Sequence, residues 1–406
     1  MNVEFQRKMD RILGVPLCRF LSLLPRARRR AVDAPPPKKI LVVLLSEMGS
    51  LVLAQPMFRS VRARYPEASI YALVFQRNKE VLDILNEVPE GNILTIRNTS
   101  LKTLAQDGLA ALRTLRFIGV DTVIDCELFA RAGAILSFLS GAEVRVGFER
   151  HTQEGLYRGR FINRSVLYNP YQHIAHQFLT LAEAIEGKGT PTVKRPVVDR
   201  KLTLPPMDVR DGELDATRSH LEMSFPSTKG KRLVLLYPGG GLLPIRAWPL
   251  ASFKTLTAQL TGGGFVVGIV GLAQDKPLAR AIQQDVAEAE RENCIDLTGY
   301  TKTVRELMLV FHLAELLVTN DGGPGHFASM TPMPSIILFG PETPALYGSL
   351  DPEAVHFFKN LSCSPCLTAY NHRNSPCDGD NQCLKTIQPA EVWAAAQKIL
   401  STGRNR

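Results

Sequence analysis

The 406-residue sequence contains no apolar run long enough to cross a membrane. Its most hydrophobic N-terminal stretch, residues 12–24, is interrupted by Pro16 and Arg19, whereas a spanning helix needs about 20 apolar residues. Acidic residues near the start, Arg19 within the apolar stretch and the lack of a small-residue cleavage site also make this stretch a poor signal peptide. We therefore expect neither a transmembrane helix nor a secretory signal here.

Two phosphate-binding motifs are missing as well. There is no Gly-Lys-Ser/Thr, which argues against a P-loop kinase, and no Gly-x-Gly-x-x-Gly follows the first predicted strand, which argues against a dinucleotide-dependent oxidoreductase. The composition, 45% apolar and 21% charged, is that of a folded chain rather than a disordered one. Its length exceeds what one hydrophobic core usually holds, so we expect two domains.

Positive charge is concentrated near the N-terminus. Residues 1–39 hold ten Lys and Arg against three Asp and Glu, with a cluster over residues 26–30. Combined with the apolar stretch, this predicts a basic amphipathic arm that lies on an anionic membrane surface. The proline run at residues 35–37 is typical of a linker, and a disordered tail remains the alternative. No aromatic interleaving or nucleic-acid motif is present, so nucleic acid is not an expected partner.

From residue 38 onward, apolar strands alternate with amphipathic helices. This pattern indicates parallel sheets covered on both faces, that is, an α/β fold. Strands are predicted over residues 40–45, 70–75, 93–96, 122–125, 144–147, 233–237, 265–270, 294–297, 316–319 and 335–339. Helices are predicted over residues 51–64, 78–87, 101–117, 128–139, 250–261, 276–288 and 304–313, with another beginning near Pro324. We divide the chain into an arm and linker (1–37), a first domain (38–205), a connection (206–231) and a second domain (232–406).

The most informative segment follows the predicted strand at residues 316–319. It reads Asn320-Asp321-Gly322-Gly323, and the helix beginning near Pro324 carries His326. The glycines predict a turn with positive φ, and the helix N-terminus would direct N–H groups at an anion. The strand at 335–339 ends in Gly340-Pro341-Glu342, at the edge where open α/β sheets bind ligands. A plain tight turn with His326 in the core is the alternative.

These residues resemble the family 9 glycosyltransferases, the bacterial heptosyltransferases that build the lipopolysaccharide core. The family pattern of Asp, small residue, Gly and His, followed by Phe-Gly-Pro-Thr-Asp/Glu-Pro, is similar to Asp321 to His326 and to residues 339–344. Residues 39–56 and 237–253 resemble two further family segments. The resemblance implies the GT-B fold, two Rossmann-like doubly wound parallel-sheet domains facing a central cleft. The acceptor would bind the first domain and the nucleotide-sugar the second, and the last helix, residues 390–400, would pack back on the first domain.

The resemblance also implies a reaction and a donor site. We expect an inverting transferase that moves a sugar, heptose from ADP-heptose above all, to a lipid-linked acidic saccharide, needs no cofactor for transfer and works in the cytoplasm at the inner face of the plasma membrane. The expected donor-binding residues are Pro238, Gly239, Gly240, Gly241, Arg246, Asp275, Asp321, Gly322, Gly323 and His326. Arg246 would supply positive charge to the diphosphate. Asp275 would hold ribose hydroxyls, and a solvated helix start is equally open for it.

The general base departs from the family pattern. In the family, the loop after the first strand reads Ser-x-x-Gly-Asp, and the Asp is the proposed base; here Ser50 replaces it. A serine hydroxyl does not accept a proton unaided at neutral pH, so the catalytic candidates are Ser50 by position and Glu47, a carboxylate in the same loop, as base. An ordinary surface role for Glu47 stays open. So do two other functions, a sugar-nucleotide-binding scaffold protein without activity and a nucleotide-sugar epimerase.

Arginines and cysteines supply two further sets of candidates. Arg145, Arg150, Arg158 and Arg160 surround Tyr157 and suit bidentate pairing with an acidic acceptor, with a solvated loop as the alternative. Four of the seven cysteines lie within residues 363–383, and they permit a structural zinc site. These are Cys363, Cys366, Cys377 and Cys383. An iron–sulfur cluster, free thiols or disulfides are alternatives, and a reducing cytosol disfavours the last. Cys18, Cys126 and Cys294 are predicted to be buried as small apolar residues.

Overall fold

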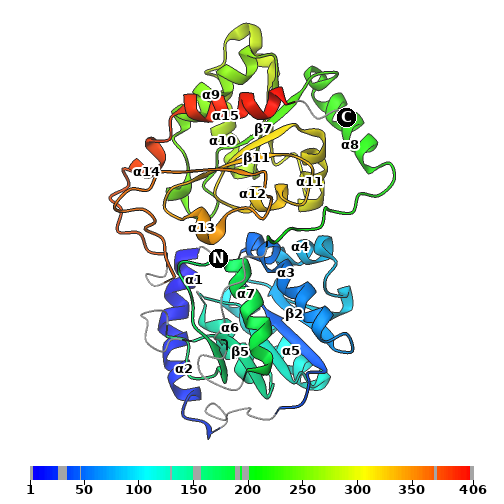
Figure 1. Ribbon diagram of the computed structural model, residues 1–406, viewed down its shortest axis with the longest axis vertical. Coiled ribbons are helices and arrows are strands. Elements are labelled where there is room, and N and C mark those ends of the chain that lie inside the picture. The colour runs from blue at the N-terminus through cyan, green and yellow to red at the C-terminus, as the bar shows by residue number, and fades with distance from the viewer. Residues whose placement is uncertain are drawn as a thin grey trace. The chain divides into compact units, whose positions relative to one another are not determined.

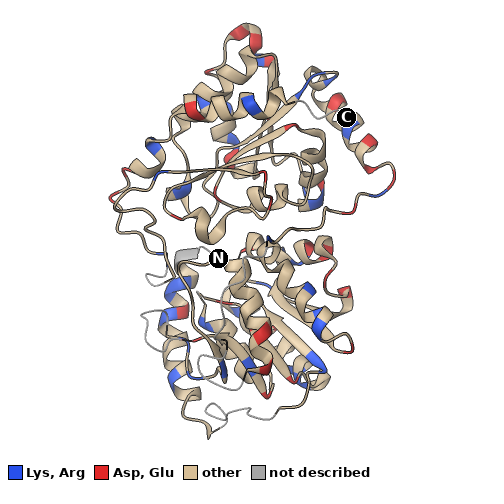
Figure 2. Cartoon of the chain, viewed as in Figure 1, with Lys and Arg blue, Asp and Glu red and all other residues tan. Residues whose placement is uncertain are grey.

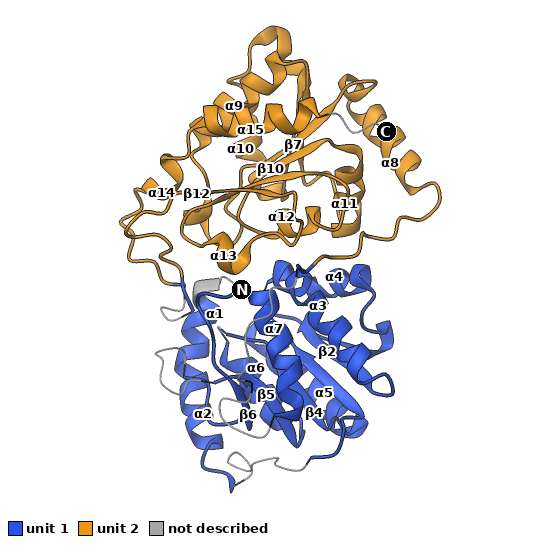
Figure 3. Ribbon diagram, viewed as in Figure 1, with its two compact units in different colours: residues 1–202, 368–373 blue, residues 203–367, 374–406 orange. Residues whose placement is uncertain are grey.

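The computed structural model describes residues 3–25, 34–45, 47–128, 130–149, 157–187, 193, 201–369 and 373–402. The chain divides into two compact units, which Figure 3 shows in different colours. Unit 1 comprises residues 1–202 together with the short segment 368–373, and unit 2 comprises residues 203–367 and 374–406. A piece of the C-terminal half of the sequence therefore belongs to the first unit.

Unit 1 is built on a six-stranded parallel sheet with the strand order β3-β2-β1-β4-β5-β6. Its strands are β1 (Lys39–Val43), β2 (Ser69–Phe75), β3 (Ile93–Ile96), β4 (Thr122–Asp125), β5 (Val144–Phe148) and β6 (Arg164–Val166). Its helices are α1 (Val3–Met9), α2 (Val15–Leu21), α3 (Met48–Arg64), α4 (Lys79–Leu85), α5 (Leu101–Ile118), α6 (Arg131–Leu139) and α7 (Ile174–Glu183). The central strand β1 is almost wholly buried because helices cover both faces of the sheet (Figure 1).

Unit 2 repeats the plan with the order β12-β11-β10-β7-β8-β9, again all parallel. Its strands are β7 (Leu233–Tyr237), β8 (Val266–Gly271), β9 (Cys294–Thr298), β10 (Leu316–Asn320), β11 (Ser335–Phe339) and β12 (Val355–Phe358). Its helices are α8 (Glu213–Ser224), α9 (Leu250–Gly262), α10 (Lys276–Gln283), α11 (Val304–Leu313), α12 (Gly323–Ala328), α13 (Pro344–Tyr347), α14 (Gln382–Lys385) and α15 (Pro389–Ser401). The predicted strands and helices are confirmed within a few residues, and the sixth strand of each sheet, β6 and β12, was not predicted.

Both sheets have the strand order of a doubly wound Rossmann fold, so each has one point where the order reverses. In unit 1 this switch point lies between β1 and β4, and in unit 2 between β7 and β10. Ligands of open α/β sheets bind outside the carboxyl ends of the strands at such points. The loops that follow β1, β4, β7 and β10 are therefore the places to look for a site.

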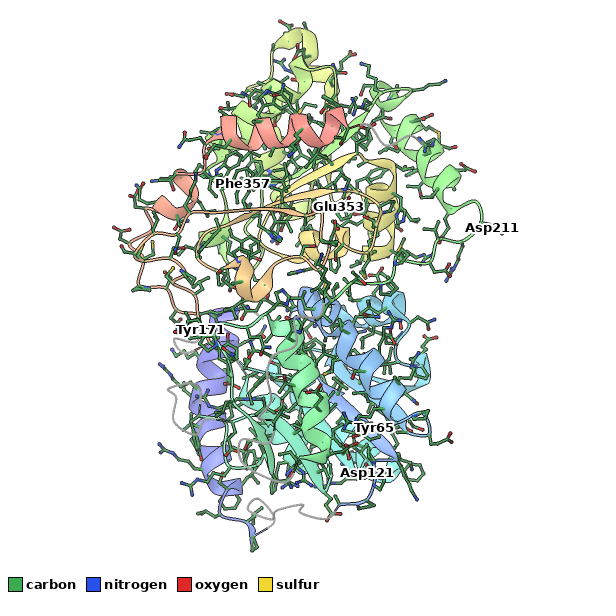
Figure 4. The ribbon with its side chains drawn as sticks, in the orientation of Figure 1. Tyr65, Asp121, Tyr171, Asp211, Glu353 and Phe357 are labelled. Atoms are coloured by element: carbon green, nitrogen blue, oxygen red, sulfur yellow. The ribbon has the colours of Figure 1, made fainter. Side chains whose placement is uncertain are left out.

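Local signals explain the element ends. In α5, Ser100 and Thr103 exchange hydrogen bonds in a capping box, and Gly119, at φ 73°, ends the helix in the left-handed conformation. Asp121, labelled in Figure 4 near Tyr65 at the amino-terminal edge of the sheet, accepts the N–H groups of Lys38 and Lys39 at 2.9 Å. This carboxylate fixes the beginning of β1, so the loop after β1 emerges at the opposite edge.

The predicted N-terminal arm is a helix packed on unit 1. Residues 3–21 form α1, a π-helical turn at Asp10–Gly14 and α2. Cys18 and Leu21 pack into a cluster with Ala134, Phe138 and Phe161, and Asp10 pairs with Arg131 at 2.7 Å. The segment is thus part of the folded unit. No helix in the described part of the chain is long and apolar enough to span a bilayer.

Two further boundaries differ from the predictions. The stretch assigned to a connection, residues 206–231, contains α8, which packs on α11 and joins it through Glu213 and Arg305 at 2.9 Å. The last helix, α15, was expected to pack on the first domain, and this was wrong. Its buried residues Val392, Ala396 and Leu400 recur every four positions and join the core of unit 2 beside α9.

Candidate active site

Asn320, the last residue of β10, organises the switch point of unit 2. Its amide nitrogen donates to the carbonyls of Pro238 and Gly239 at 3.1 and 3.0 Å, and its amide oxygen accepts the Trp248 N–H at 2.9 Å. One side chain thereby holds the loop after β7 and the segment that leads into α9. Asn320 belongs to the Asn-Asp-Gly-Gly segment, and no role was predicted for its side chain.

The glycine loop after β7 is closely packed. Gly241 has φ 60°, and a Cβ on Gly240 would come 2.8 Å from the Pro244 Cα. The pKa of the Tyr237 hydroxyl is raised to about 12 by burial and, second, by the nearby Asp275. The expected role of this loop was to present N–H groups to a diphosphate. That role stays a prediction.

Arg246 lies between two carboxylates. Its Nη2 is 3.0 Å from Glu342, which follows β11, and its Nε is 3.8 Å from Asp321, which follows β10. All three side chains are buried. Arg246 therefore pairs with two carboxylates of its own unit, and its expected contact with the donor diphosphate stays a prediction. It holds two carboxylates in place. Glu342 was missed as a site residue, although its place directly after a predicted strand was the available signal.

The helix after β10 begins at Gly323, as predicted, with different local geometry. Gly322 is extended at φ 167°, so the prediction of a positive-φ turn was wrong. The helix α12 spans six residues, which gives a smaller dipole than a full-length helix. Gly325 lies against Ile337 with no room for a side chain, and His326 is buried within unit 2. This agrees with the alternative of a core histidine as well as with a site role.

Asp275 stabilises the turn that follows β8, near the predicted donor-binding residues. Its carboxylate accepts the Leu272 N–H at 2.8 Å and caps the turn between β8 and α10. Because Asp275 also raises the pKa of Tyr237, it lies close to the end of β7. One carboxylate oxygen of Asp275 therefore caps the turn that leads into α10, as the helix-start alternative predicts. A contact of Asp275 with ribose stays a prediction.

The switch point of unit 1 is held by buried acidic residues that sequence reasoning missed. Glu127, after β4, accepts the Leu45 N–H at 2.5 Å, and Asn78 donates to the Leu45 carbonyl at 3.2 Å. Asp125, at the end of β4, accepts from Arg158 at 2.6 Å. Burial raises the pKa of Asp125, and Arg158 opposes this effect. Together they fix the main chain immediately before the predicted catalytic loop.

Glu47 lies immediately before α3, at the N-cap position of this helix. It has an extended backbone, its side chain makes no capping bond, and its carbonyl accepts the Ser50 N–H at 3.1 Å. Its carboxylate, 31% exposed, forms an ion pair with the buried guanidinium of Arg373. Both residues belong to unit 1, since Arg373 lies in the returning segment 368–373. Ser46 lies outside the described residues.

The four predicted acceptor arginines differ in their surroundings. Arg145 is fully buried and donates to the carbonyls of Phe161 and Ala142 at 2.6 and 2.8 Å, so we assign it a structural role in place of ligand binding. Arg158 is engaged by Asp125 and by the carbonyls of Ala130 and Glu127. Arg160 is exposed, and Arg150 lies outside the described residues. Only Arg160 has the exposure that the acceptor prediction requires among the described members.

The cysteine cluster is gathered in space without forming a metal centre. The pKa of Cys383 is raised to about 11, first by burial and then by the nearby thiols of Cys366, Cys363 and Cys377. Within the described residues, no three His, Cys, Asp or Glu side chains are placed to hold a metal ion, so the arrangement does not support the zinc prediction. All four are free thiols, and Cys366 contacts Ser375 at 3.0 Å. Cys18, Cys126 and Cys294 are buried, as predicted.

Two doubly wound Rossmann-like units in one chain have the GT-B fold class. A model of glycosyltransferase family 9 (heptosyltransferase) matches residues 109–375, which is more than half of the chain. The chain belongs to this family and is a glycosyltransferase.

Named relatives and solved structures agree with this assignment. The chain is 23% identical over 367 residues to lipopolysaccharide heptosyltransferase 2 of Salmonella typhimurium, covering 89% of this chain and 99% of the relative. The structure of Escherichia coli ADP-heptose lps heptosyltransferase II superposes with a TM-score of 0.69 at 20% identity, covering 90% of this chain and 99% of that one. Escherichia coli heptosyltransferase WaaC with ADP gives a TM-score of 0.60 at 16% identity, covering 89% and 99%. These two likenesses concern the fold.

Proposed function

We propose that this protein transfers heptose from ADP-heptose to a lipid-linked acidic saccharide, in the synthesis of lipopolysaccharide or a related cell-surface glycan. The observation that carries the proposal is the part-exposed carboxylate of Glu47 at the carboxyl end of β1, the switch point of unit 1. Family membership supports it, and so does the relative named lipopolysaccharide heptosyltransferase 2. We place the reaction in the cytoplasm, at the inner face of the plasma membrane.

The donor would bind at the switch point of unit 2. Carboxylates accept hydrogen bonds from sugar hydroxyls, so Asp321 suits the heptose and Arg246 would hold it in orientation. Main-chain N–H groups at Gly239, Gly240, Gly322 and Gly323 would face the diphosphate, with Pro238 and His326 shaping the surroundings. Exposed Leu242 and Leu272 follow β7 and β8 and offer an apolar surface for a nucleobase. The solved heptosyltransferase WaaC contains ADP, which agrees with this donor.

Glu47 would act as the general base in unit 1. The acceptor hydroxyl loses its proton to Glu47 while its oxygen forms a bond to the anomeric carbon of heptose. The bond from that carbon to the diphosphate oxygen breaks, and ADP leaves with the electron pair. One displacement inverts the anomeric centre. Arg373 orients the carboxylate of Glu47, and Glu127 fixes the main chain before it. Arg160 would meet an acidic group of the acceptor.

A binding comparison and a turnover assay test the proposal. Calorimetric titration with ADP, UDP and GDP should show tightest binding for ADP, and ADP-heptose with a heptose-deficient lipopolysaccharide core should give the extended core. Preference for UDP or GDP would contradict the donor. Tight ADP binding without product would favour a non-catalytic scaffold, for which the replacement of the family's Asp by Ser50 is the specific observation. Isomerised donor in the absence of acceptor would identify an epimerase instead.

A further inference from the structure

The N-terminal helix has a second apolar face in addition to the one that packs on unit 1. The buried face is formed by Gly14, Cys18 and Leu21. The exposed large apolar side chains of the segment are Phe5, Ile12, Leu13, Leu17, Phe20, Leu23 and Leu24. We call these seven residues the exposed apolar stripe. Leu23 is 73%, Phe20 64% and Leu13 58% exposed. Large apolar side chains that belong to a hydrophobic core are buried instead.

The stripe has helical spacing and lies along the whole segment. Ile12 and Leu13 in the π-helical turn and Leu17 and Phe20 in α2 follow one another at intervals of three and four residues, and Leu23 and Leu24 continue this spacing in the turn after the helix. In Figure 1, α1 and α2 run one after the other along the side of unit 1. A continuous line of large side chains is therefore presented away from the core.

The charge beside the stripe is positive. Lys8, Arg11 and Arg19 are exposed, and Figure 2 shows the basic residues recurring along α1 and α2. The acidic Asp10 is turned toward the protein, where it accepts from both the main chain and the guanidinium of Arg131 at 2.9 and 2.7 Å. Its charge is thus compensated inside unit 1, and the outward charge of these described side chains is cationic.

We propose that the exposed apolar stripe is a docking surface for an anionic lipid bilayer, with the N-terminal helix lying in the plane of the membrane interface. Large aliphatic and aromatic side chains enter the boundary between headgroups and acyl chains, and the flanking Lys and Arg extend toward lipid phosphates. Electrostatic complementarity favours an anionic bilayer over a neutral one. A protein partner or a second copy of this chain would have no comparable need for the exposed cations Lys8, Arg11 and Arg19 beside the stripe.

This docking surface is independent of the proposed transfer chemistry, because vesicle binding requires neither donor nor acceptor. It also differs from the disordered tail that the sequence left as an alternative. The helix is held to unit 1 through Cys18, Leu21 and the Asp10–Arg131 pair, so a docked helix fixes the orientation of the entire unit on the bilayer.

Sedimentation with vesicles tests the surface. The full chain should bind vesicles of phosphatidylcholine with phosphatidylglycerol, and bind pure phosphatidylcholine vesicles more weakly. The triple variant Leu13→Gln, Leu17→Gln, Phe20→Gln should bind at least about tenfold more weakly, since three apolar side chains no longer enter the interface. The matched control is Leu109→Gln with Phe117→Gln, two exposed apolar residues on α5, and it should bind as the parent protein does.

A fluorescence probe tests insertion directly. Phe20→Trp should show a blue-shifted emission when anionic vesicles are added. Phe117→Trp should not, because α5 lies away from the proposed surface. The two native tryptophans contribute the same background emission in both variants. Arg11→Gln with Arg19→Gln should weaken binding at about 0.1 M salt and have little further effect at about 0.5 M, where screening is strong.

Three results would overturn the proposal: equal vesicle binding by the triple variant and the parent, equal loss in the α5 control, or a Phe20→Trp emission that does not move. Concentration-dependent dimerisation that the triple variant abolishes, without vesicle binding by the parent, would identify the stripe as a contact between copies. Thermal unfolding of each variant, expected to match the parent because all changed side chains are exposed, separates lost docking from lost folding.

Discussion

The carboxylate of Glu47 and the guanidinium of Arg373 form an ion pair across 326 positions of sequence. Arg373 has φ 55°, in the left-handed region, and its side chain is buried, while Glu47 keeps about a third of its side chain exposed. The returning segment that carries Arg373 belongs to unit 1, so the pair lies within one compact unit. An ionised carboxylate held by a buried cation and open to solvent on one side has the properties of a positioned base.

Glu47→Gln keeps the shape of the side chain and removes the proton acceptor. We expect kcat to fall by about 10² to 10⁴, with ADP affinity little changed, because Glu47 lies in unit 1 and the donor residues in unit 2. Steady-state kinetics with ADP-heptose and a heptose-deficient core measures this. Ser50→Asp, which restores the family residue, should recover part of the activity in the Glu47→Gln background. Full turnover by Glu47→Gln alone would eliminate Glu47 as the base.

Arg373→Ala should change the pH dependence of the same reaction. Without the adjacent cation, the carboxylate of Glu47 binds its proton more tightly, so the acidic limb of the kcat profile should move to higher pH. Arg373→Lys keeps the charge and should move the limb less. ADP binding should be unaffected in both. A uniform loss of kcat at every pH, equal for both variants, would show that Arg373 contributes only to folding of the segment.

Arg246→Met should destabilise unit 2. It leaves Asp321 and Glu342 buried close to one another without their shared cation, which costs about 3 to 5 kcal/mol when one partner of a buried pair is removed. Urea unfolding measures this loss, and ADP affinity should fall with it because Asp321 is no longer held. Glu342→Gln in the Arg246→Met background removes one of the two repelling charges and should restore part of the stability. Equal stability of Arg246→Met and the parent would contradict the buried cluster.

Glu149, directly after β5, provides a pH-dependent test of stability. Burial raises its pKa from 4.5 to about 7, and Arg160 opposes this effect. A carboxyl group with a raised folded-state pKa costs nothing below about 4.5, costs progressively more between 4.5 and 7, and costs the full amount above 7. Glu149→Gln should therefore increase the free energy of unfolding at pH 8 by about 1 to 2 kcal/mol, after allowance for partial solvent screening, and have no effect near pH 4.

Chemical denaturation of Glu149→Gln at these two pH values checks this prediction. The exposed Glu67→Gln is the matched control and should leave stability unchanged at both. If Glu149→Gln increased the free energy of unfolding equally at pH 4 and pH 8, the difference in stability between the variant and the parent would come from packing and not from ionisation of Glu149.

The sequence by itself determined the two sheets and the position of each candidate loop. Runs such as residues 40–45 and 316–318 are apolar at every position because a strand covered on both faces needs no alternation, and the caps Ser100 and Gly119 fix the two ends of one helix through contacts within a few residues. The carboxyl ends of parallel strands share one edge, so Glu47, Asp321 and Glu342 could be placed at strand ends without knowledge of any long-range contact.

Only the tertiary structure decided which charges meet. Arg246 pairs with Asp321 and Glu342, and Arg145, which was expected to bind an acceptor, is buried and donates to the main chain inside unit 1. Arg373 reaches Glu47 because the chain returns to the first unit near its end. Periodicity reports the local environment of a residue, whereas an ion pair depends on the path that the chain takes between its partners. A sequence pattern therefore locates a charged residue at a sheet edge and leaves its partner to the fold.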